Sequence, residues 1–439
     1  MKKYNLLKYT WPIFLEYIMQ LLVTNVDKIM VNTMSETAVS SIANATTVLE
    51  VLLNTFTVIS LAITIMASQY FGKNDHEKIK QVYSMGLLVT GITSLALSII
   101  LIITSPMLFS FIKVPVECMK DTLIYMNIML IGLVIQGLYS GYVAIFRTQG
   151  WMKYSLFVSF IINTINIVGN YLLIYGVGFI PSLGVAGAAI SSVLSRVIGL
   201  ILLIIIFKRN SQISIDFKSL KPWPSDLFKT MLKLGLPSGG EGISYNASQM
   251  VILMFVNMFG NAIIKLRSFA SMFQMCAYMF SSSISQASQI IVGYIIGSGD
   301  NDLADKEVNK CLWISMFVSV LASAILYIFS DQIYGLFIKE AYLLAIAKKV
   351  MFVQIFLETA RAVNMTMVRC LQAAGDTMYP MTIGIIFMWG VATLFSYILG
   401  VKMNMGLVGV WIAMCLDESI RAIIFIIRWK QGKWRSNQI

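Results

Sequence analysis

Residues 86–112 read GLLVTGITSLALSIILIITSPMLFSFI, a run of 27 positions without a charged side chain. A helix rises about 1.5 Å per residue, so about 20 apolar residues cross the hydrocarbon of a bilayer. Five other uncharged stretches are long enough for one span each: 51–72, 122–146, 242–264, 268–299 and 379–401. A sixth stretch, 154–195, is long enough for two spans. These stretches predict a set of membrane-spanning helices.

The composition agrees with a membrane protein. Of the 439 residues, 58% are hydrophobic and 12% are charged, whereas soluble domains carry about 25% charged residues. A water-facing surface of this size cannot be covered by so few charges, which excludes a soluble enzyme, a disordered chain and a nucleic-acid-binding module. The net charge of +12 is explained by basic residues gathered in loops on one side of a membrane.

Further segments complete about twelve spans: 10–34, 197–207, 309–337, 343–368 and 405–427. Basic residues gather in both termini and in alternate loops, namely Lys2, Lys3, Lys8 and the regions 73–80, 147–153, 208–229, 306–310 and 428–435. This bias predicts that both termini are cytoplasmic. We expect a multi-pass protein of the cytoplasmic (inner) membrane of a prokaryote.

The two halves of the sequence match at an offset of 225 residues. Pro12 falls on Pro237, and Glu16 falls on Glu241. The same offset carries Gly72 onto Gly297. We predict an all-α protein with two six-helix lobes, 1–207 and 229–439, joined by a cytoplasmic linker at 208–228. Repeats of this kind occur in secondary transporters, with duplication for assembly alone as the alternative.

Polar residues follow one face of the first span. Glu16 and Asp27 are eleven residues apart, which is about 20° past three full helical turns. Gln20 and Thr24 lie between them on the same face. Such a stripe cannot face lipid, so we expect it to line a wet cavity or to contact another polar helix. A local ion pair of Asp27 with Lys28 is the alternative.

The span that opens the second lobe repeats this theme. We expect it to begin at Pro237-Ser238-Gly239-Gly240-Glu241, with Tyr245, Ser248 and Gln249 on the face of Glu241. The Pro and Gly residues weaken a helix and suit a bend or a site. The repeat mate of Asp27 is Ile252. The two lobes are therefore not equivalent.

Other polar positions allow two interpretations each. Asn163, Asn166 and Asn170 share one face, and they either line the cavity or join helices by hydrogen bonds. Glu358 and Arg361 form either an intrahelical ion pair or a gate or proton site. In the last span, a structural ion pair is predicted among Asp417, Glu418 and Arg421. Two residues of other spans are left without a role, Glu50 and Arg196.

The sequence offers no signature of catalysis or of a bound metal. Its five cysteines form no CxxC motif, and its single histidine, His76, lies in a polar run outside the spans. An intramembrane enzyme would need a nucleophile with a base, or metal ligands, within the spans. We therefore expect no enzyme activity, no cofactor and no metal centre.

Short motifs in both halves lead to a family. They are Pro12…Gln20…Val26-Asp27, RTQG at 147–150, NIVGNYLLIYG at 166–176, GVAGAA at 184–189, GLP at 235–237, LQAAGD at 371–376 and GLVG at 406–409. With them the chain resembles the multidrug and toxic compound extrusion (MATE) family over nearly its whole length. The resemblance implies antiport, in which a small organic and often cationic compound leaves the cell as protons or sodium ions enter. It implies a protein that works in the lipid bilayer, and we expect a monomer.

The resemblance also implies roles for single residues. In that family the aspartate of the first helix is a coupling-ion site, which points to Asp27, and the NorM-type branch adds a glutamate that corresponds to Glu241. Where the family often has an aspartate, this chain has Asn170, which cannot titrate but can bind sodium together with Asp27. A further family acid falls at Arg361, with Glu358 one turn earlier. Proton and sodium coupling both stay open at this point.

Other classes of function remain as alternatives. A lipid-linked saccharide flippase of the same superfamily would be expected to have a more cationic cavity. Glu16, Asp27 and Glu241 instead predict an acidic cavity, which favours cationic cargo. A channel is the third possibility, although two unequal repeats with buried carboxylates favour alternating access.

Overall fold

A computed structural model of the chain describes residues 5–178 and 181–439. The basic residues Lys2 and Lys3 lie outside the described residues. Within the described ranges the chain forms helices and no strand. The elements of the first half are α1 (Leu6–Asn32), α2 (Glu36–Gly72), α3 (His76–Phe111), α4 (Val116–Ile131), α5 (Leu133–Thr148), α6 (Met152–Tyr175), α7 (Gly184–Asn210) and the 3₁₀ helix η1 (Phe217–Leu220).

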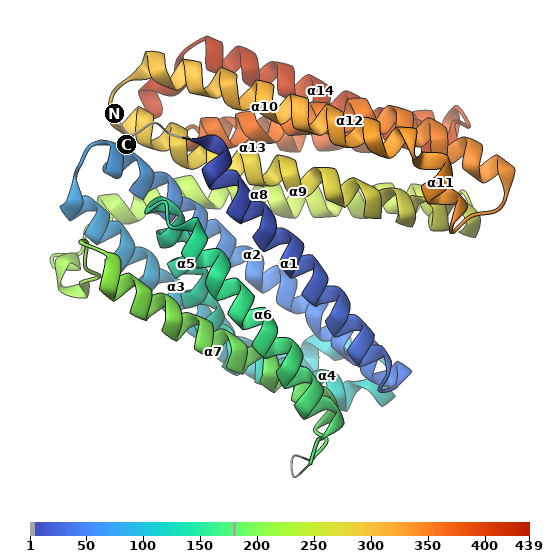
Figure 1. Ribbon diagram of the computed structural model, residues 1–439, viewed down its shortest axis with the longest axis horizontal. Helices are drawn as coiled ribbons and strands as arrows, with labels where there is room; N and C mark the ends of the chain where they lie inside the picture. The colour runs from blue at the N-terminus through green and yellow to red at the C-terminus, as the bar shows by residue number, and fades with distance from the viewer. Residues whose placement is uncertain (1–4, 179–180) are drawn as a thin grey trace. The chain divides into compact units, whose positions relative to one another are not determined.

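The second half continues with the same kind of element. Its elements are α8 (Ser225–Asn257), α9 (Asn261–Gly297), α10 (Asn301–Ile328), α11 (Ser330–Gly335), α12 (Ala341–Ala373), α13 (Met378–Phe387), the π-helical segments η2 (Met388–Thr393) and η3 (Ser396–Lys402), α14 (Gly406–Lys430) and the 3₁₀ helix η4 (Lys433–Asn437). Figure 1 shows their order along the chain.

The described helices supply the twelve predicted spans. Six are long and apolar enough to cross a membrane by length and composition, and the bent pair α4–α5 makes a seventh. The other five of span length, α1, α8, α9, α12 and α14, carry more polar residues. Helices that contact other polar helices need less apolar surface than helices that face lipid. Six spans fall in each half of the sequence.

One predicted span is broken. The stretch 122–146 reads as a single helix in the sequence, but the structure bends by 49° between α4 and α5. Gly132 occupies the break, and a Cβ there would lie 2.5 Å from Cγ2 of Val193 on α7. The bend therefore depends on a residue without a side chain at the point where α7 passes.

The prediction that Pro237 opens its helix is wrong. Helix α8 begins at Ser225 and runs through Pro237 without a break. A proline inside a helix leaves the carbonyl four residues earlier without its usual donor. That carbonyl belongs to Lys233, and it accepts a hydrogen bond from Oγ1 of Thr377 at 3.1 Å. The helix continues because a side chain replaces the missing N–H.

The chain divides into two compact units. The N-terminal unit consists of Pro12–Ala67 and Asp75–Leu232, and the C-terminal unit of Lys233–Ile439 with Ser68–Asn74 and a short segment that ends at Trp11. In the N-terminal unit the buried apolar core includes Phe56, Phe109 and Met126. The predicted lobe limits, 1–207 and 229–439, stay a prediction.

In the C-terminal unit, α12 is the central helix. It packs against α9, α10 and α14 (Figure 1). After α14 the chain folds back, and the rings of Trp429 and Trp434 stack with their centroids 4.3 Å apart. Gln69 donates to the carbonyl of Ala373 at 2.7 Å, which fixes Ser68–Asn74 to this unit.

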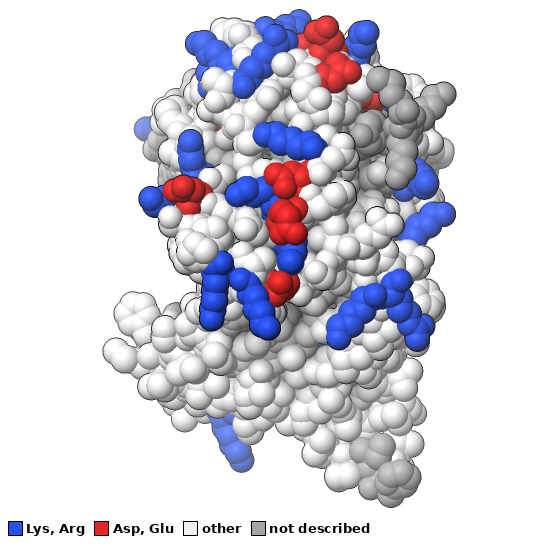
Figure 2. All heavy atoms as spheres, turned by 90° about the vertical axis from the view of Figure 1, so that its left-hand side faces the viewer, with Lys and Arg blue, Asp and Glu red and all other residues white. Residues whose placement is uncertain are grey.

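The loop ends of the C-terminal unit carry paired charges. Arg435 lies 3.2 Å from Asp305, and Lys310 lies 3.0 Å from Glu307. The upper part of Figure 2 shows this end of the unit, where Lys and Arg side chains lie beside Asp and Glu. Charged side chains are expected outside the hydrocarbon layer, where water solvates them.

Apolar side chains point outward along the spans. On α3, Ile103, Met107 and Phe111 are 74%, 78% and 82% exposed. They are four residues apart and so share one face of the helix. An apolar surface of this kind is unfavourable in water and matches the acyl chains of a bilayer.

Two repeat-related glycines mark a close helix contact in the C-terminal unit. A Cβ on Gly297 would lie 2.7 Å from the carbonyl carbon of Gln69. A Cβ on Gly72 would lie 2.8 Å from the carbonyl carbon of Gly297. The ends of α2 and α9 therefore touch backbone to backbone, as small residues permit in membrane helices.

We expect the Gly297→Ala variant to be less stable by about 1–3 kcal/mol, because the added methyl overlaps backbone atoms that cannot rotate away. Thermal unfolding of the purified protein in detergent measures this. The matched control is Gly335→Ala, since an added Cβ there meets nothing within 4 Å. Equal melting temperatures of the two variants would contradict the close contact.

Candidate functional site

The polar stripe of α1 divides between two environments. Gln20, Thr24 and Asp27 line a cavity in the N-terminal unit. Glu16 is not among the lining residues; its carboxylate lies 3.6 Å from the guanidinium of Arg147. The predicted common face therefore exists, but its first carboxylate has a basic partner.

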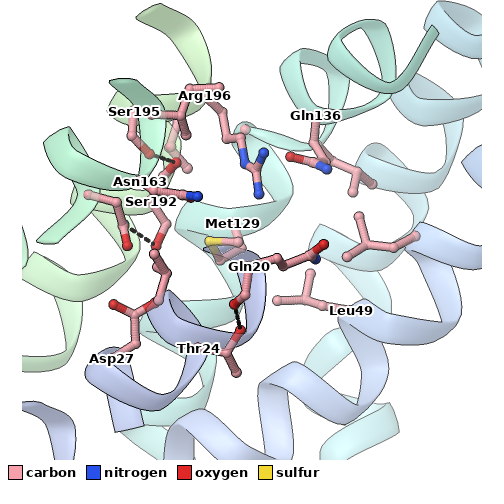
Figure 3. A pocket seen from close by; sticks show the side chains of 17 residues that line it. Gln20, Thr24, Asp27, Leu49, Met129, Gln136, Asn163, Ser192, Ser195 and Arg196 are labelled. Atoms are coloured by element: carbon pink, nitrogen blue, oxygen red, sulfur yellow. Dashed lines mark hydrogen bonds between the residues drawn. The ribbon is translucent and has the colours of Figure 1, made fainter. Parts of the chain in front are cut away.

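The cavity has a volume of about 190 Å³. Helices α1, α2, α4, α5, α6 and α7 all contribute to it, and Figure 3 shows their side chains. The lining residues are Gln20, Val23, Thr24, Asp27, Leu49, Leu53, Met129, Gly132, Leu133, Gln136, Ile162, Asn163, Asn166, Ser192, Val193, Ser195 and Arg196. Four carboxamides, several hydroxyls, one carboxylate and one guanidinium thus face this space beside apolar side chains.

Asp27 is held from α6. Nδ2 of Asn170 donates a hydrogen bond of 2.7 Å to Oδ1 of Asp27. The carbonyl oxygen Oδ1 of Asn170 is buried and accepts no hydrogen bond from the described residues. Lys28 is exposed, and within the ranges described it has no ion pair with Asp27. The alternative of a local Asp27–Lys28 pair is therefore not what the structure contains.

The other two predicted asparagines show both expected behaviours. Asn163 and Asn166 line the cavity, and Nδ2 of Asn166 also donates to Oγ of Ser192 on α7 at 3.2 Å. Asn163 differs, because its Nδ2 is buried without an acceptor among the described residues. Cavity lining and helix–helix bonding thus occur on the same face of α6.

Arg196 is the main residue that the sequence analysis left without a role. It lines the same cavity as Asp27, and its guanidinium lies 5.1 Å from the ring centroid of Tyr139. Among the described residues, Asp27 is the one carboxylate and Arg196 the one guanidinium that line this cavity. The predicted acidic character, which rested on Glu16, Asp27 and Glu241, does not describe this cavity.

Further lining residues were also missed. Gln136 lies in an uncharged stretch that reads as a plain span, and Ser192 and Ser195 precede Arg196 on α7. A signal was available in the sequence, because polar residues at positions 191, 192, 195 and 196 fall on one face of that span. A polar face in a membrane helix predicts contact with a cavity or with another polar helix.

The C-terminal unit holds a buried network of charges that joins α12 to α14. Arg361 is paired with Glu358, and its Nε lies 3.3 Å from Glu418. Arg421 lies 2.5 Å from Asp417 and 3.4 Å from Glu418. The two pairs that the sequence analysis treated separately are therefore one network of three carboxylates and two guanidiniums.

Neutral donors complete this network. Asn364 donates to Glu418 at 2.5 Å, and Gln354 donates to Glu358 at 2.9 Å. The indole of Trp411 in turn donates to Gln354 at 2.5 Å. Glu358 is fully buried, and a buried charge needs such partners to be tolerated.

Glu241 lies against α13. A Cβ on Gly384 would be 3.2 Å from Oε1 of Glu241. Farther along α8, Ser248 shares a hydrogen bond of 2.8 Å with Thr393. Tyr245 is 39% exposed, and Gln249 is half-buried. The predicted residues of α8 thus share a helix face that packs in part on α13 and η2.

Comparison with known proteins places the chain in a family. A family model described as MatE matches residues 12–172 and again residues 237–398. The chain belongs to the MatE family. The two MatE segments begin at the offset of 225 residues found in the sequence, which confirms the internal repeat. The resemblance to this family is confirmed as well.

Relatives of known sequence and structure match over most of the chain. The "Uncharacterized transporter YisQ" of Bacillus subtilis is 30% identical and covers 99% of this chain and 95% of its own length. The "Probable multidrug resistance protein NorM" of Streptococcus pneumoniae is 23% identical over 97% of this chain and 93% of its own.

Two solved structures show the same fold. A MATE protein in the bent conformation has a TM-score of 0.89, 18% identity, and coverage of 98% of this chain and 95% of that chain. A MOP superfamily transporter from Pyrococcus furiosus, described as having a binding pocket of reverse polarity, has a TM-score of 0.87 at 18% identity, with coverage of 98% and 95%. The MatE fold confirms the prediction of an all-α, multi-pass membrane protein with two six-helix lobes.

MatE family members are transporters. The chain is therefore a membrane transporter and not an enzyme. MatE transporters use ion gradients and need no cofactor, and they act on small organic compounds within the membrane.

Proposed function

We propose that this protein is a secondary active antiporter that exports small organic compounds, cationic or amphipathic, in exchange for protons or sodium ions by alternating access. It acts as a monomer in the cytoplasmic membrane of a prokaryote, with both termini in the cytoplasm. The observation that carries the proposal is the Asp27 carboxylate, which opens into a cavity of the N-terminal unit and is held by Asn170.

Ion coupling follows from the surroundings of Asp27. An ionised carboxylate at membrane depth requires a proton, a cation or hydrogen-bond donors. The structure gives it one donor at 2.7 Å, from Asn170. Beside that donor, the buried carbonyl oxygen of Asn170 lacks a partner in the described part of the chain. Carboxylate and amide oxygens are the ligands that hard cations prefer, so a sodium ion fits as well as a proton.

The second half supplies further candidates for coupling and gating. Glu241 lies on α8 with no hydrogen bond to the described residues, and Glu358 and Arg361 belong to the buried network of α12 and α14. Protonation of a carboxylate in such a network changes which partners it can hold. We assign ion coupling to Asp27, Glu241 and Glu358, and contact with the exported compound to Tyr245 and Gln249 besides the residues of the cavity.

The nature of the cargo is inferred from the cavity and the relatives. A cavity lined by apolar side chains together with charged, carboxamide and hydroxyl groups suits amphipathic organic molecules. The NorM relatives are named as probable multidrug resistance proteins, which supports export of such compounds.

Transport into everted membrane vesicles tests the proposal. We expect vesicles that contain the protein to accumulate ethidium when either a pH gradient or a sodium gradient is imposed, and the effective gradient names the coupling ion. Vesicles without the protein, and loaded vesicles treated with an ionophore, are the controls. Absence of uptake under both gradients, with the protein inserted, would contradict ethidium-type export and would favour a lipid-linked saccharide flippase.

A further inference from the structure

The cavity of the N-terminal unit contains an arginine, Arg196, without a carboxylate of the described residues in direct contact; the Asp27 carboxylate lines the same cavity but forms no ion pair with it. Among the described residues of this unit, Lys80 is paired with Asp216 and Arg147 with Glu16. In the part of the chain that the structure describes, no carboxylate oxygen lies within 4.0 Å of the Arg196 guanidinium. Arginine at membrane depth is normally paired, because the loss of water around its charge is costly.

The contact of Arg196 with Tyr139 does not replace a counter-ion. The guanidinium lies 5.1 Å from the centre of this buried ring. A cation–π contact is worth about 0.5–2 kcal/mol and does not neutralise the charge of the half-buried arginine. Tyr139 therefore positions the guanidinium without neutralising its charge.

A second unpaired donor faces the same space. Asn163 is 9% exposed, and its Nδ2 is buried without an acceptor among the described residues. In Figure 3 the carboxamide of Asn163 and the guanidinium of Arg196 extend toward the same part of the cavity, and Gln136 lies across from them. Both unsatisfied groups are N–H donors, so the missing partner is an acceptor, and the positive charge favours an anionic one.

We propose that Arg196, assisted by Asn163, binds a carboxylate of the exported compound. The protein then favours amphipathic compounds that carry a carboxylate besides their cationic or apolar part. This inference rests on the proposed export function and names its substrate class. A planar guanidinium matches a carboxylate with two parallel hydrogen bonds.

The size of the cavity limits what this subsite holds. Its volume of about 190 Å³ is below the range of about 300–1,000 Å³ that is usual for drug-sized ligands. It therefore takes one ring with its carboxylate, while the rest of the compound lies outside it. The apolar residues Leu49, Met129 and Ile162 of the lining suit such a ring.

A pair of dyes that differs by one methyl ester tests the proposal. Rhodamine 110 carries a free carboxylate on its phenyl ring, and rhodamine 123 is its methyl ester. Binding is measured by fluorescence anisotropy on the purified full-length protein in an uncharged detergent. We expect the wild-type protein to prefer rhodamine 110. In Arg196→Gln, its affinity for rhodamine 110 should fall about tenfold or more, while that for rhodamine 123 changes less than about twofold.

Matched variants keep this result interpretable. Arg209→Gln removes the same charge from an exposed position on the same helix and should bind both dyes as the wild type does. Arg196→Lys keeps the positive charge but loses the planar guanidinium that can form two parallel hydrogen bonds. This variant should retain part of the preference for rhodamine 110. Retained binding of rhodamine 123 shows that Arg196→Gln is folded.

Three outcomes would overturn the proposal. They are equal losses for the two dyes in Arg196→Gln, an unchanged preference in that variant, and no binding of rhodamine 110 by the wild type. The measurement needs no ion gradient. It therefore separates failure of this inference from failure of the antiport function, which the vesicle experiment tests.

Discussion

Replacement of Asp27 by asparagine is expected to reduce ion-driven efflux to the level of vesicles that lack the protein. Asparagine has nearly the same size as aspartate and keeps an oxygen that can accept the hydrogen bond from Asn170. It cannot gain or lose a proton, and it offers a cation no negative charge. The variant should therefore insert and fold normally while the exchange of cargo for ion stops.

Transport of ethidium in everted vesicles measures this effect, with the amount of inserted protein determined in the same preparation. Glu117→Gln is the matched control, because it neutralises an exposed carboxylate in the first turn of α4. That variant should transport at the wild-type rate. Normal efflux by Asp27→Asn would refute Asp27 as the coupling site.

The largest effect on stability is expected from Arg361→Met. The side chain is 6% exposed and is paired with Glu358 and Glu418. Methionine fills a similar space but leaves two buried carboxylates without this guanidinium. Removal of one partner of a buried ion pair typically costs about 3–5 kcal/mol, since the remaining charge is uncompensated. The free energy of unfolding should fall by this amount.

Thermal unfolding in detergent checks the prediction. The control is Arg369→Met on the same helix, where the arginine is half-buried and donates to Gln372 at 3.3 Å. Adding Glu358→Gln to Arg361→Met should restore part of the lost stability, because it removes one of the unpaired charges. If Arg361→Met unfolds at the same temperature as Arg369→Met, the network does not stabilise the contact between α12 and α14.

The sequence was most informative where structure depends on neighbouring residues. A span such as 86–112 is apolar along its whole length, so its helix follows from the bilayer without reference to the rest of the chain. The stripe of Gln20, Thr24 and Asp27 follows from helical periodicity alone, and the structure places all three on one cavity. The offset of 225 residues predicted the two-lobe repeat that the family model matches twice.

Local reasoning was weaker where a helix depends on a distant partner. Pro237 reads as a helix start, yet α8 continues through it because Thr377 binds the carbonyl that proline leaves free. Gly132 reads as an ordinary small residue in a span, yet it permits the bend at the contact with Val193. The partner lies more than 60 positions away along the chain in each case.

By itself the sequence determined that this chain is a helical membrane protein with a duplicated architecture and a carboxylate on the first span. Hydropathy and periodicity are properties of consecutive residues, and a bilayer acts on each helix separately. Only the tertiary structure decided that Glu16 is paired with Arg147, that Asn170 holds Asp27, and that Arg196 shares the cavity with Asp27. These contacts join different helices, and their partners are set by how the helices pack, which spacing along a single helix does not encode.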